Sequence, residues 1–161
     1  MEKAPKKTNA ARILDELGID YALLEAPVDV SDLSAVGMAH ALRVEPHEVY
    51  KTLVVRGDRN GILLACIPAA AELDFKLLAV ASGDKSTSMV PLKEVQPLTG
   101  YIRGGCSPIG TKKPYPVYLD ESAILLDRLF VSAGHRGVQF HLTPDDLIRA
   151  VHATYAPLTR S

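Results

Sequence analysis

The sequence has little cysteine and no long hydrophobic run, and both shortages exclude whole classes of protein. Its two cysteines, Cys66 and Cys106, stand neither in a CxxC motif nor at metal-ligand spacing, so we predict no disulfide framework and a reduced, cytoplasmic protein. The longest apolar stretch, residues 62–71, is too short to span a bilayer. Residues 1–7 are basic and lack the apolar core of a signal peptide. We therefore expect them to form a flexible tail, and we expect no membrane partner.

An excess of charge of one sign is also lacking. The 18 basic and 19 acidic residues leave a formal net charge of −1, so the surface as a whole has little attraction for a polyanion. The five histidines include no pair at i, i+4 and no carboxylate at ligand spacing, so we predict no metal site and no other cofactor. DNA is not an expected partner, and any RNA must be held by a local cluster of basic side chains.

The 161 residues are predicted to form a single compact domain, residues 1–161, with a mixed α+β fold. Capping residues and apolar periodicity predict four helices: from Thr8 or Asn9 to Gly18, from Ser34 to Leu42, from Asp74 to near Gly83, and from Thr143 through Val151. Apolar runs predict strands near residues 21–24, 49–55, 62–68, 87–90, 101, 117–119, 129–131 and 138–142. The strand over 62–68 is apolar on both faces, so we place it in the centre of the sheet.

Two glycine-rich turns are the first candidate functional elements. One covers residues 100–110, and the other covers residues 132–137 between two short apolar runs. Glycine lets the backbone reach positive φ and approach a ligand closely, so N–H groups left out of helix and sheet can bind a carbonyl oxygen or a phosphate. Such turns are also common as plain connections, so on their own they leave the function open.

Lys51 is the candidate catalytic residue. Strand alternation places it on the same face as Val49, Leu53 and Val55, which is the face expected to be buried. A lysine near the end of a strand can also lay its stem along apolar surface and keep its ammonium in water. The functional interpretation gains weight because this lysine and both glycine turns occur in one small domain.

Other catalytic motifs are either excluded by the spacing of their residues or only weakly supported by the sequence. Residues 105–112 read G-x-x-x-x-G-T-K, but threonine and lysine are exchanged relative to a P-loop, and the prolines that follow forbid its helix. Cys106 and His135 could form a nucleophile and base if the two turns meet, although a lone loop cysteine is more often structural. Ser107 and Ser132 have no elbow or triad context. None of these patterns by itself therefore predicts an enzyme nucleophile.

These residues together resemble the YbaK/EbsC family of free-standing aminoacyl-tRNA editing domains, which are related to the insertion domain of bacterial prolyl-tRNA synthetase. The resemblance rests on Tyr50-Lys51-Thr52-Leu53, on residues 99–113 and on residues 131–137, in order and at compatible spacing. The motif Gly-Tyr-x-x-Gly-Gly-x-Ser-Pro-x-Gly-x-Lys-Lys is most similar to sequences of the Cys-tRNA(Pro) deacylase branch. The resemblance implies a mixed, barrel-like sheet flanked by helices, with a pocket for the charged 3′ end of tRNA.

The resemblance also implies a chemistry and a set of site residues. In the cysteine branch the substrate's own thiol attacks its ester, so the enzyme mainly orients the ester and stabilises charge. Lys51 would be catalytic, and Arg103, Lys112 and Lys113 would contact tRNA. The substrate would be bound by residues of both glycine turns and of the segment before the second helix, namely Gly104, Gly105, Cys106, Ser107, Pro108, Gly110, Ser132, Ala133, Gly134, Arg136, Leu33 and Ser34. The implied partners are aminoacyl-tRNA and prolyl-tRNA synthetase.

Two departures from the family pattern bear on the choice of amino acid. Residues 29–37, where the family places an aromatic side chain against the substrate, offer only Leu33 and Ser34, and Gln139 stands where some relatives have an acid. A deacylase for another mischarged tRNA, such as Ala-tRNA(Pro), therefore stays open. A non-catalytic module that binds tRNA or a synthetase, and a protein-interaction domain, are the alternatives outside enzymology.

Overall fold

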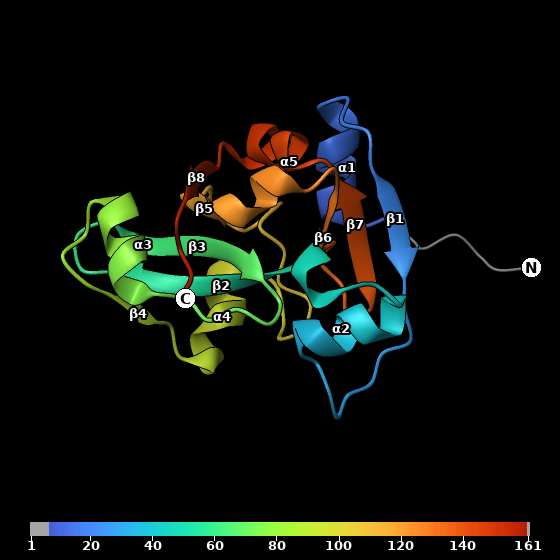
Figure 1. Cartoon of the computed structure of the whole chain (residues 1–161), viewed down its shortest axis with the longest axis horizontal. Coiled ribbons are helices and arrows are strands. Elements are labelled where there is room, and N and C mark those ends of the chain that lie inside the picture. Colours follow the sequence, from blue (N-terminus) through green and yellow to red (C-terminus); the bar gives the residue numbers. More distant parts are fainter. Residues whose placement is uncertain (1–6, 161) are drawn as a thin grey trace, which may run out of the picture.

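The computed structural model describes residues 7–160, which fold into one mixed sheet with helices on both faces (Figure 1). The helices are α1 (Asn9–Glu16), α2 (Ala35–Leu42), α3 (Phe75–Ser82), α4 (Leu92–Thr99) and α5 (Pro144–Val151), with short 3-10 helices η1 (Pro46–Glu48) and η2 (Glu121–Leu125). The strands are β1 (Ala22–Glu25), β2 (Val49–Gly57), β3 (Gly61–Pro68), β4 (Thr87–Met89), β5 (Val117–Asp120), β6 (Leu129–Ser132), β7 (Val138–Leu142) and β8 (Thr154–Ala156). None of these described helices is long and apolar enough to cross a membrane.

The four helices predicted from the sequence begin at the predicted caps. Thr8, Ser34, Asp74 and Thr143 each accept a hydrogen bond from a backbone N–H in the first turn of the helix that follows. A side-chain oxygen at this position satisfies an N–H that has no partner within the helix. These helix starts are therefore fixed by local chemistry, and the predictions are confirmed.

The sheet has the order β1-β7-β6-β2-β3-β5-β8, and β4 pairs separately with β2. β3 lies between β2 and β5, so the prediction of a central strand over residues 62–68 is confirmed. β6 and β7 form an antiparallel hairpin around the second glycine turn. The mixed α+β prediction is confirmed. Because the two end strands, β1 and β8, do not pair with each other, the sheet is not closed, and barrel-like describes it only loosely.

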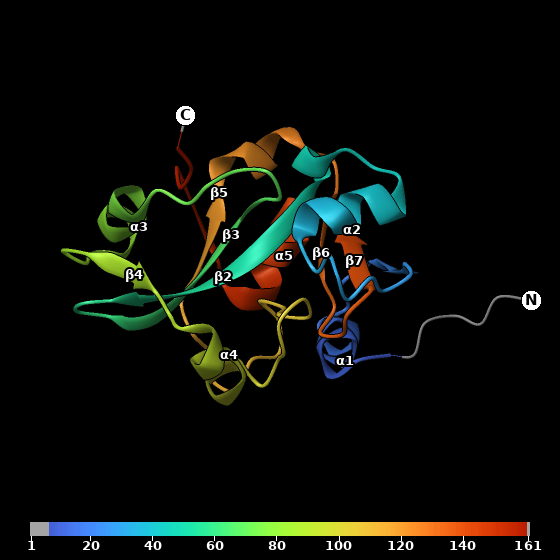
Figure 2. The same cartoon turned by 90° about the horizontal axis from the view of Figure 1, so that it is seen from below.

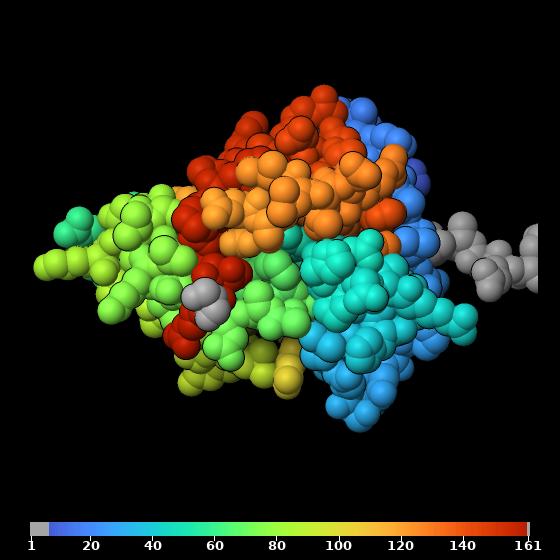
Figure 3. Space-filling model, viewed as in Figure 1, coloured from blue at the N-terminus to red at the C-terminus, as the bar shows by residue number. Residues whose placement is uncertain are grey.

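Helices cover both faces where the sheet carries the two glycine turns. α1 packs Ala10, Ala11 and Leu14 into the core that contains Val131 and Phe140, whereas α2 packs Ala39 against Phe130 on the other face. Figure 2 shows α1 and α2 on opposite sides of β6 and β7. The loop before α2, residues 27–34, projects from the body of the molecule (Figures 1 and 3). α2 also covers the start of β2, where Val49 packs with Ala39, and Lys51 two residues further along the strand is half-buried.

One predicted strand is wrong, two elements were not predicted, and most of the predicted tail lies outside the described residues. The strand predicted around Tyr101 is wrong, because this residue lies in a loop whose backbone N–H is taken by the Thr99 hydroxyl. α4 was not predicted because it contains Pro97, which normally disfavours a helix interior, and the short edge strand β8 was also missed. The predicted tail lies outside the described residues except for Lys7, whose ammonium pairs with Asp15 at 2.6 Å.

Candidate functional site

A gap in the pairing of β2 creates the candidate site. β2 pairs with β6 only at Val49 and Tyr50, and on the same edge it pairs with β4 only from Val55 onward. The edge between these pairings borders a cavity of about 350 Å³, which is within the usual range for small-ligand sites. The cavity is lined by Ser31, Asp32, Leu33, Ser34, Ala35, Met38, Val49, Tyr50, Lys51, Thr52, Arg103, Gly104, Cys106, Ser132 and Gln139.

The backbone of Thr52 faces this cavity. The Val54 carbonyl accepts a hydrogen bond from the Val90 N–H, so it points to the edge of β2 that carries the gap. Residues two apart in an extended strand direct their N–H and C=O groups to the same edge. The N–H and C=O of Thr52 therefore point toward the gap, where no strand pairs with them, and they are available to a ligand.

The Lys51 ammonium is the cation of this cavity on the β2 side. Its side chain is half-buried, and burial lowers the pKa of Lys51, an effect that the Glu72 carboxylate partly opposes. Among residues 7–160 no ion pair within 4.0 Å includes Lys51. A partly desolvated cation without a close counter-ion interacts strongly with negative charge that develops nearby.

The two glycine turns are held together by Tyr101 and Arg136. The Tyr101 hydroxyl donates to the Ile109 carbonyl at 2.5 Å, which braces the first turn. The Arg136 Nε donates to the Arg103 carbonyl at 2.8 Å, which joins the second turn to the first. The Tyr101 ring also lies against Gly134, whose φ is +103°. The turns thus form one rigid wall, and sequence reasoning gave Tyr101 no part in it.

Replacing Gly134 with alanine should break this wall. A Cβ built on Gly134 would lie 2.8 Å from Tyr101 Cε1, and an L-residue rarely adopts this φ, so we expect a loss of about 2 kcal/mol or more in the free energy of unfolding. Gly18→Ala is the matched control, because Gly18 also has positive φ but has nothing within 4 Å of a built Cβ. Urea denaturation of both variants measures the difference, and equal losses would contradict the packing role of Tyr101.

Among the described residues, no hydroxyl or thiol group around the cavity is hydrogen-bonded to a histidine or lysine, and the carboxylates that pair with Ser31 and Ser34 are weak bases. Ser34 Oγ donates to the Asp32 carboxylate and accepts from the Gly37 N–H, so it caps α2. Its hydrogen bonds lower the pKa of Asp32, which makes that carboxylate a weak base. Ser132 Oγ accepts from the Gly134 N–H. Burial raises the pKa of the Cys106 thiol to about 11, so little of it is thiolate at neutral pH.

His135 does not complete a nucleophile with Cys106. The turns do meet, since a Cβ on Gly105 would lie 3.2 Å from the Arg136 backbone nitrogen, but the His135 side chain is exposed and does not line the cavity. In addition, residues 7–160 contain no group of three or more His, Cys, Asp or Glu side chains placed to hold a metal ion.

The structure brings together about half of the site residues proposed from the sequence. The residues that line the main cavity are Lys51, Leu33, Ser34, Arg103, Gly104, Cys106 and Ser132. Arg136 lines a second cavity, and the other proposed residues are not part of the main lining: Gly105, Ser107, Pro108, Gly110, Ala133, Gly134, Lys112 and Lys113. Ser107 is fully buried, and its Oγ accepts from the Ile109 N–H, so it shapes the turn.

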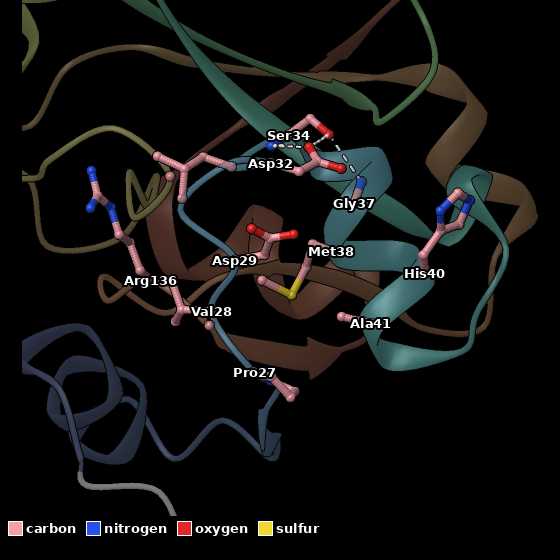
Figure 4. Close-up of a pocket in the computed structure, with 13 residues that line it drawn as sticks. Pro27, Val28, Asp29, Asp32, Ser34, Gly37, Met38, His40, Ala41 and Arg136 are labelled. Carbon is pink, nitrogen blue, oxygen red and sulfur yellow. Dashed lines mark hydrogen bonds between the residues drawn. The ribbon is translucent and has the colours of Figure 1, made fainter.

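A second cavity of about 310 Å³ adjoins the first and contains Arg136. It lies on the other side of the loop before α2, and the two cavities share Asp32, Leu33, Ser34, Met38 and Gly104. Figure 4 shows Asp32 and Ser34 hydrogen-bonded at the start of α2, with Asp29 and Met38 beside them. The loop before α2 is therefore a common wall between two hollows.

The most unusual lining residue is Gln139, for which the sequence suggested only a departure from a family pattern. Gln139 is 5% exposed, and its Oε1 is buried without a hydrogen-bond partner within the described chain. Buried polar groups are nearly always paired, so such an atom needs an explanation. The alternation of residues 138–142 places Gln139 on the face opposite to Val138 and Phe140, but it cannot show that this face is also buried or that no neighbour pairs with the amide.

Comparisons with known proteins point to one family. The family described as the aminoacyl-tRNA editing domain matches residues 31–150. A protein of Enterococcus faecalis named "Putative Cys-tRNA(Pro)/Cys-tRNA(Cys) deacylase EbsC" is 42% identical over 158 residues, which cover 98% of this chain and 96% of that protein. A proline–tRNA ligase of Thermosipho africanus is 33% identical over 76 residues, which cover 47% of this chain and 13% of the ligase.

The fold is shared with a solved structure described as a "putative trans-editing enzyme for prolyl tRNA synthetase". The TM-score is 0.82 at 27% identity, and the superposition covers 97% of this chain and all of that one. The similarity in sequence and in fold therefore extends over nearly the whole chain.

Proposed function

The chain belongs to the aminoacyl-tRNA editing domain family, the YbaK/EbsC family, and from that premise we propose that it is a trans-acting deacylase that removes cysteine from mischarged Cys-tRNA(Pro). One observation carries the proposal: among the described residues, Lys51 in the main cavity forms no ion pair, and no hydroxyl or thiol group of the cavity is hydrogen-bonded to a histidine or lysine, or to a carboxylate other than the weakly basic Asp29 and Asp32. Such a site can catalyse cleavage of an ester whose own side chain is the nucleophile, and a cysteinyl ester is of this kind.

The proposed reaction is an intramolecular displacement. The cysteinyl thiol loses its proton, its sulfur attacks the ester carbonyl carbon, and a C–S bond forms while the C–O bond to the terminal ribose breaks. The ribose oxygen takes up a proton, and water later opens the released cyclic thiolactone to cysteine. Holding sulfur and carbonyl carbon in contact removes much of the entropic part of the barrier.

The cavity walls have separate tasks in this reaction. The Lys51 ammonium stabilises negative charge on the leaving ribose oxygen or holds the adjacent phosphate. The backbone of the Gly104 turn lies near the ester carbonyl, and the Ser132 side of the cavity forms the opposite wall around the amino acid. The Thr52 N–H is a further donor on the β2 edge.

Binding of the tRNA body is proposed to be weak. Arg103, Lys112 and Lys113 are exposed next to the cavity or along the same turn, but the chain is close to neutral overall, so these contacts depend on salt. We propose that prolyl-tRNA synthetase is the partner that supplies most of the tRNA affinity. The partial similarity to a proline–tRNA ligase supports this choice.

Cys106 is expected to be dispensable for catalysis. Its raised pKa makes it a poor nucleophile, and serine keeps the size of the side chain, so Cys106→Ser should deacylate Cys-tRNA(Pro) within about threefold of the wild-type rate, a loss below 1 kcal/mol. Single-turnover kinetics with radiolabelled Cys-tRNA(Pro) measures this rate. An inactive variant that remains folded, or a cysteinyl adduct on Cys106 detected by mass spectrometry, would instead indicate covalent catalysis by the enzyme.

A deacylation panel tests the function itself. Purified protein is incubated separately with Cys-tRNA(Pro), Ala-tRNA(Pro) and Pro-tRNA(Pro), and loss of the ester is followed against a buffer control. We expect turnover of Cys-tRNA(Pro) and little change in the other two. Preferential cleavage of Ala-tRNA(Pro) would assign the enzyme to another substrate, and binding without any cleavage would identify a non-catalytic module.

A further inference from the structure

The Gln139 amide is a polar group whose hydrogen bonds the folded chain does not supply. In β7 it alternates with Val138 and Phe140, which enter the main core, so it faces the opposite side of the sheet. Its neighbours in register are Ser132 on β6 and Leu24 on β1. Gln139 lines the main cavity together with Ala35 and Met38 of α2. The amide is thus held in an apolar layer at the edge of the substrate cavity.

An unpaired buried acceptor is costly in the free protein. A buried oxygen without a donor has lost its water and gained nothing in return. Among the described residues, the cross-strand neighbour Ser132 accepts from the Gly134 N–H and forms no hydrogen bond with Gln139, and Ser34 on the cavity wall donates to Asp32. Groups of this kind persist where a ligand satisfies them, so Gln139 Oε1 indicates a ligand that carries a hydrogen-bond donor.

Charge around the cavity selects among the donors of an aminoacyl ester. Lys51 lies on the β2 wall and repels a second cation, whereas Gln139 lies on the β7 wall beside Ser132. The other charged lining residues, Asp32 and Arg103, have opposite signs, so Lys51 leaves the lining with a net positive charge. An aminoacyl ester carries its positive charge on the α-ammonium. The Lys51 cation therefore favours an orientation in which the ammonium lies away from Lys51 and the ester carbonyl lies toward Lys51.

We propose that Gln139 Oε1 accepts a hydrogen bond from the α-ammonium group of the aminoacyl ester, and so makes Gln139 a specificity residue for substrates with a free amine. This inference rests on the proposed deacylase function. The contact fixes one end of the amino acid while Lys51 and the Gly104 turn engage the other, which leaves the thiol to approach the carbonyl carbon. A neutral acceptor achieves this without drawing the Lys51 cation into an ion pair.

The test compares two esters in two variants. Cys-tRNA(Pro) has an α-amine, whereas 3-mercaptopropionyl-tRNA(Pro) keeps the thiol and ester but lacks it. Gln139→Met removes the acceptor with little change in volume, and Gln139→Glu keeps an acceptor. We expect Gln139→Met to lower the wild-type preference in kcat/KM for Cys-tRNA(Pro) by about 10- to 100-fold, as for loss of a hydrogen bond to a charged group. Gln139→Glu should retain the preference.

Thermal unfolding of the free proteins separates binding from folding. Because Gln139→Met removes an unpaired buried amide, its Tm should equal or exceed that of the wild type. A clear fall in Tm would show that the amide is paired in the protein and would overturn the inference. An unchanged preference in Gln139→Met would also overturn it while leaving the deacylase function standing. Failure of the wild type to cleave Cys-tRNA(Pro) at all would instead remove the proposed function.

Discussion

Lys51→Ala is expected to lower kcat/KM for deacylation of Cys-tRNA(Pro) by about 10²- to 10³-fold, the effect of removing one preorganised electrostatic group from an active site. The ammonium is half-buried beside the cavity and forms no described ion pair, so the reaction loses its cation and the fold loses no salt bridge. Removing a partly desolvated charge also relieves a cost of burial. The free energy of unfolding should therefore change little.

Two further variants make the Lys51 result specific. Lys51→Met keeps most of the apolar stem and should be as inactive as Lys51→Ala, which would separate the charge from the packing. Lys76→Ala removes an exposed lysine on α3 and should remain fully active. Single-turnover rates and urea denaturation of all three give the comparison. Wild-type turnover by folded Lys51→Ala would exclude Lys51 as the catalytic cation.

The pH dependence of the reaction should follow the thiol of the substrate. A cysteine thiol has a pKa of about 8.5, so the thiolate fraction rises by about 50-fold between pH 6.5 and pH 8.5. The rate should rise with pH in the same way, because loss of the thiol proton creates the nucleophile. At higher pH it should fall as Lys51 loses its proton, at a pH below the usual lysine value because burial lowers the pKa of Lys51.

Measuring kcat/KM from pH 6 to pH 9.5, with uncatalysed hydrolysis subtracted at each point, tests this profile. The enzyme's own groups predict other profiles. Burial raises the pKa of Cys106 to about 11, so attack by Cys106 would show no plateau in this range. A histidine base would give a rise centred near pH 6.5. A flat profile would contradict attack by the substrate thiol.

Features set by local sequence could be predicted, whereas features set by strand pairing could not. The caps at Thr8, Ser34, Asp74 and Thr143 need only a side-chain oxygen before an apolar repeat, so each helix start was correct. α4 escaped prediction because Pro97 in its interior is a local signal against helix that the fold tolerates. Local rules thus failed where the surrounding structure overrides them.

The cavity itself depends on long-range pairing. The face of the strand on which Lys51 lies could be derived from alternation. The gap beside it exists because pairing with β6 ends at Tyr50 and pairing with β4 begins at Val55. No sequence pattern reveals which strands become neighbours across such distances. For the same reason the burial of Gln139, its lack of a partner among the described residues and the bracing role of Tyr101 required the structure.

The most direct test of catalysis by the substrate's own thiol is the ratio of deacylation rates for Cys-tRNA(Pro) and Ser-tRNA(Pro), measured with the same enzyme under single-turnover conditions. The two esters are nearly isosteric and differ in one atom, sulfur or oxygen. Because a hydroxyl is a much poorer nucleophile than a thiol at neutral pH, Ser-tRNA(Pro) should be cleaved at close to the uncatalysed rate while Cys-tRNA(Pro) is cleaved rapidly. Similar rates for the two esters would show that water or an enzyme group attacks the carbonyl, and would contradict the proposed mechanism.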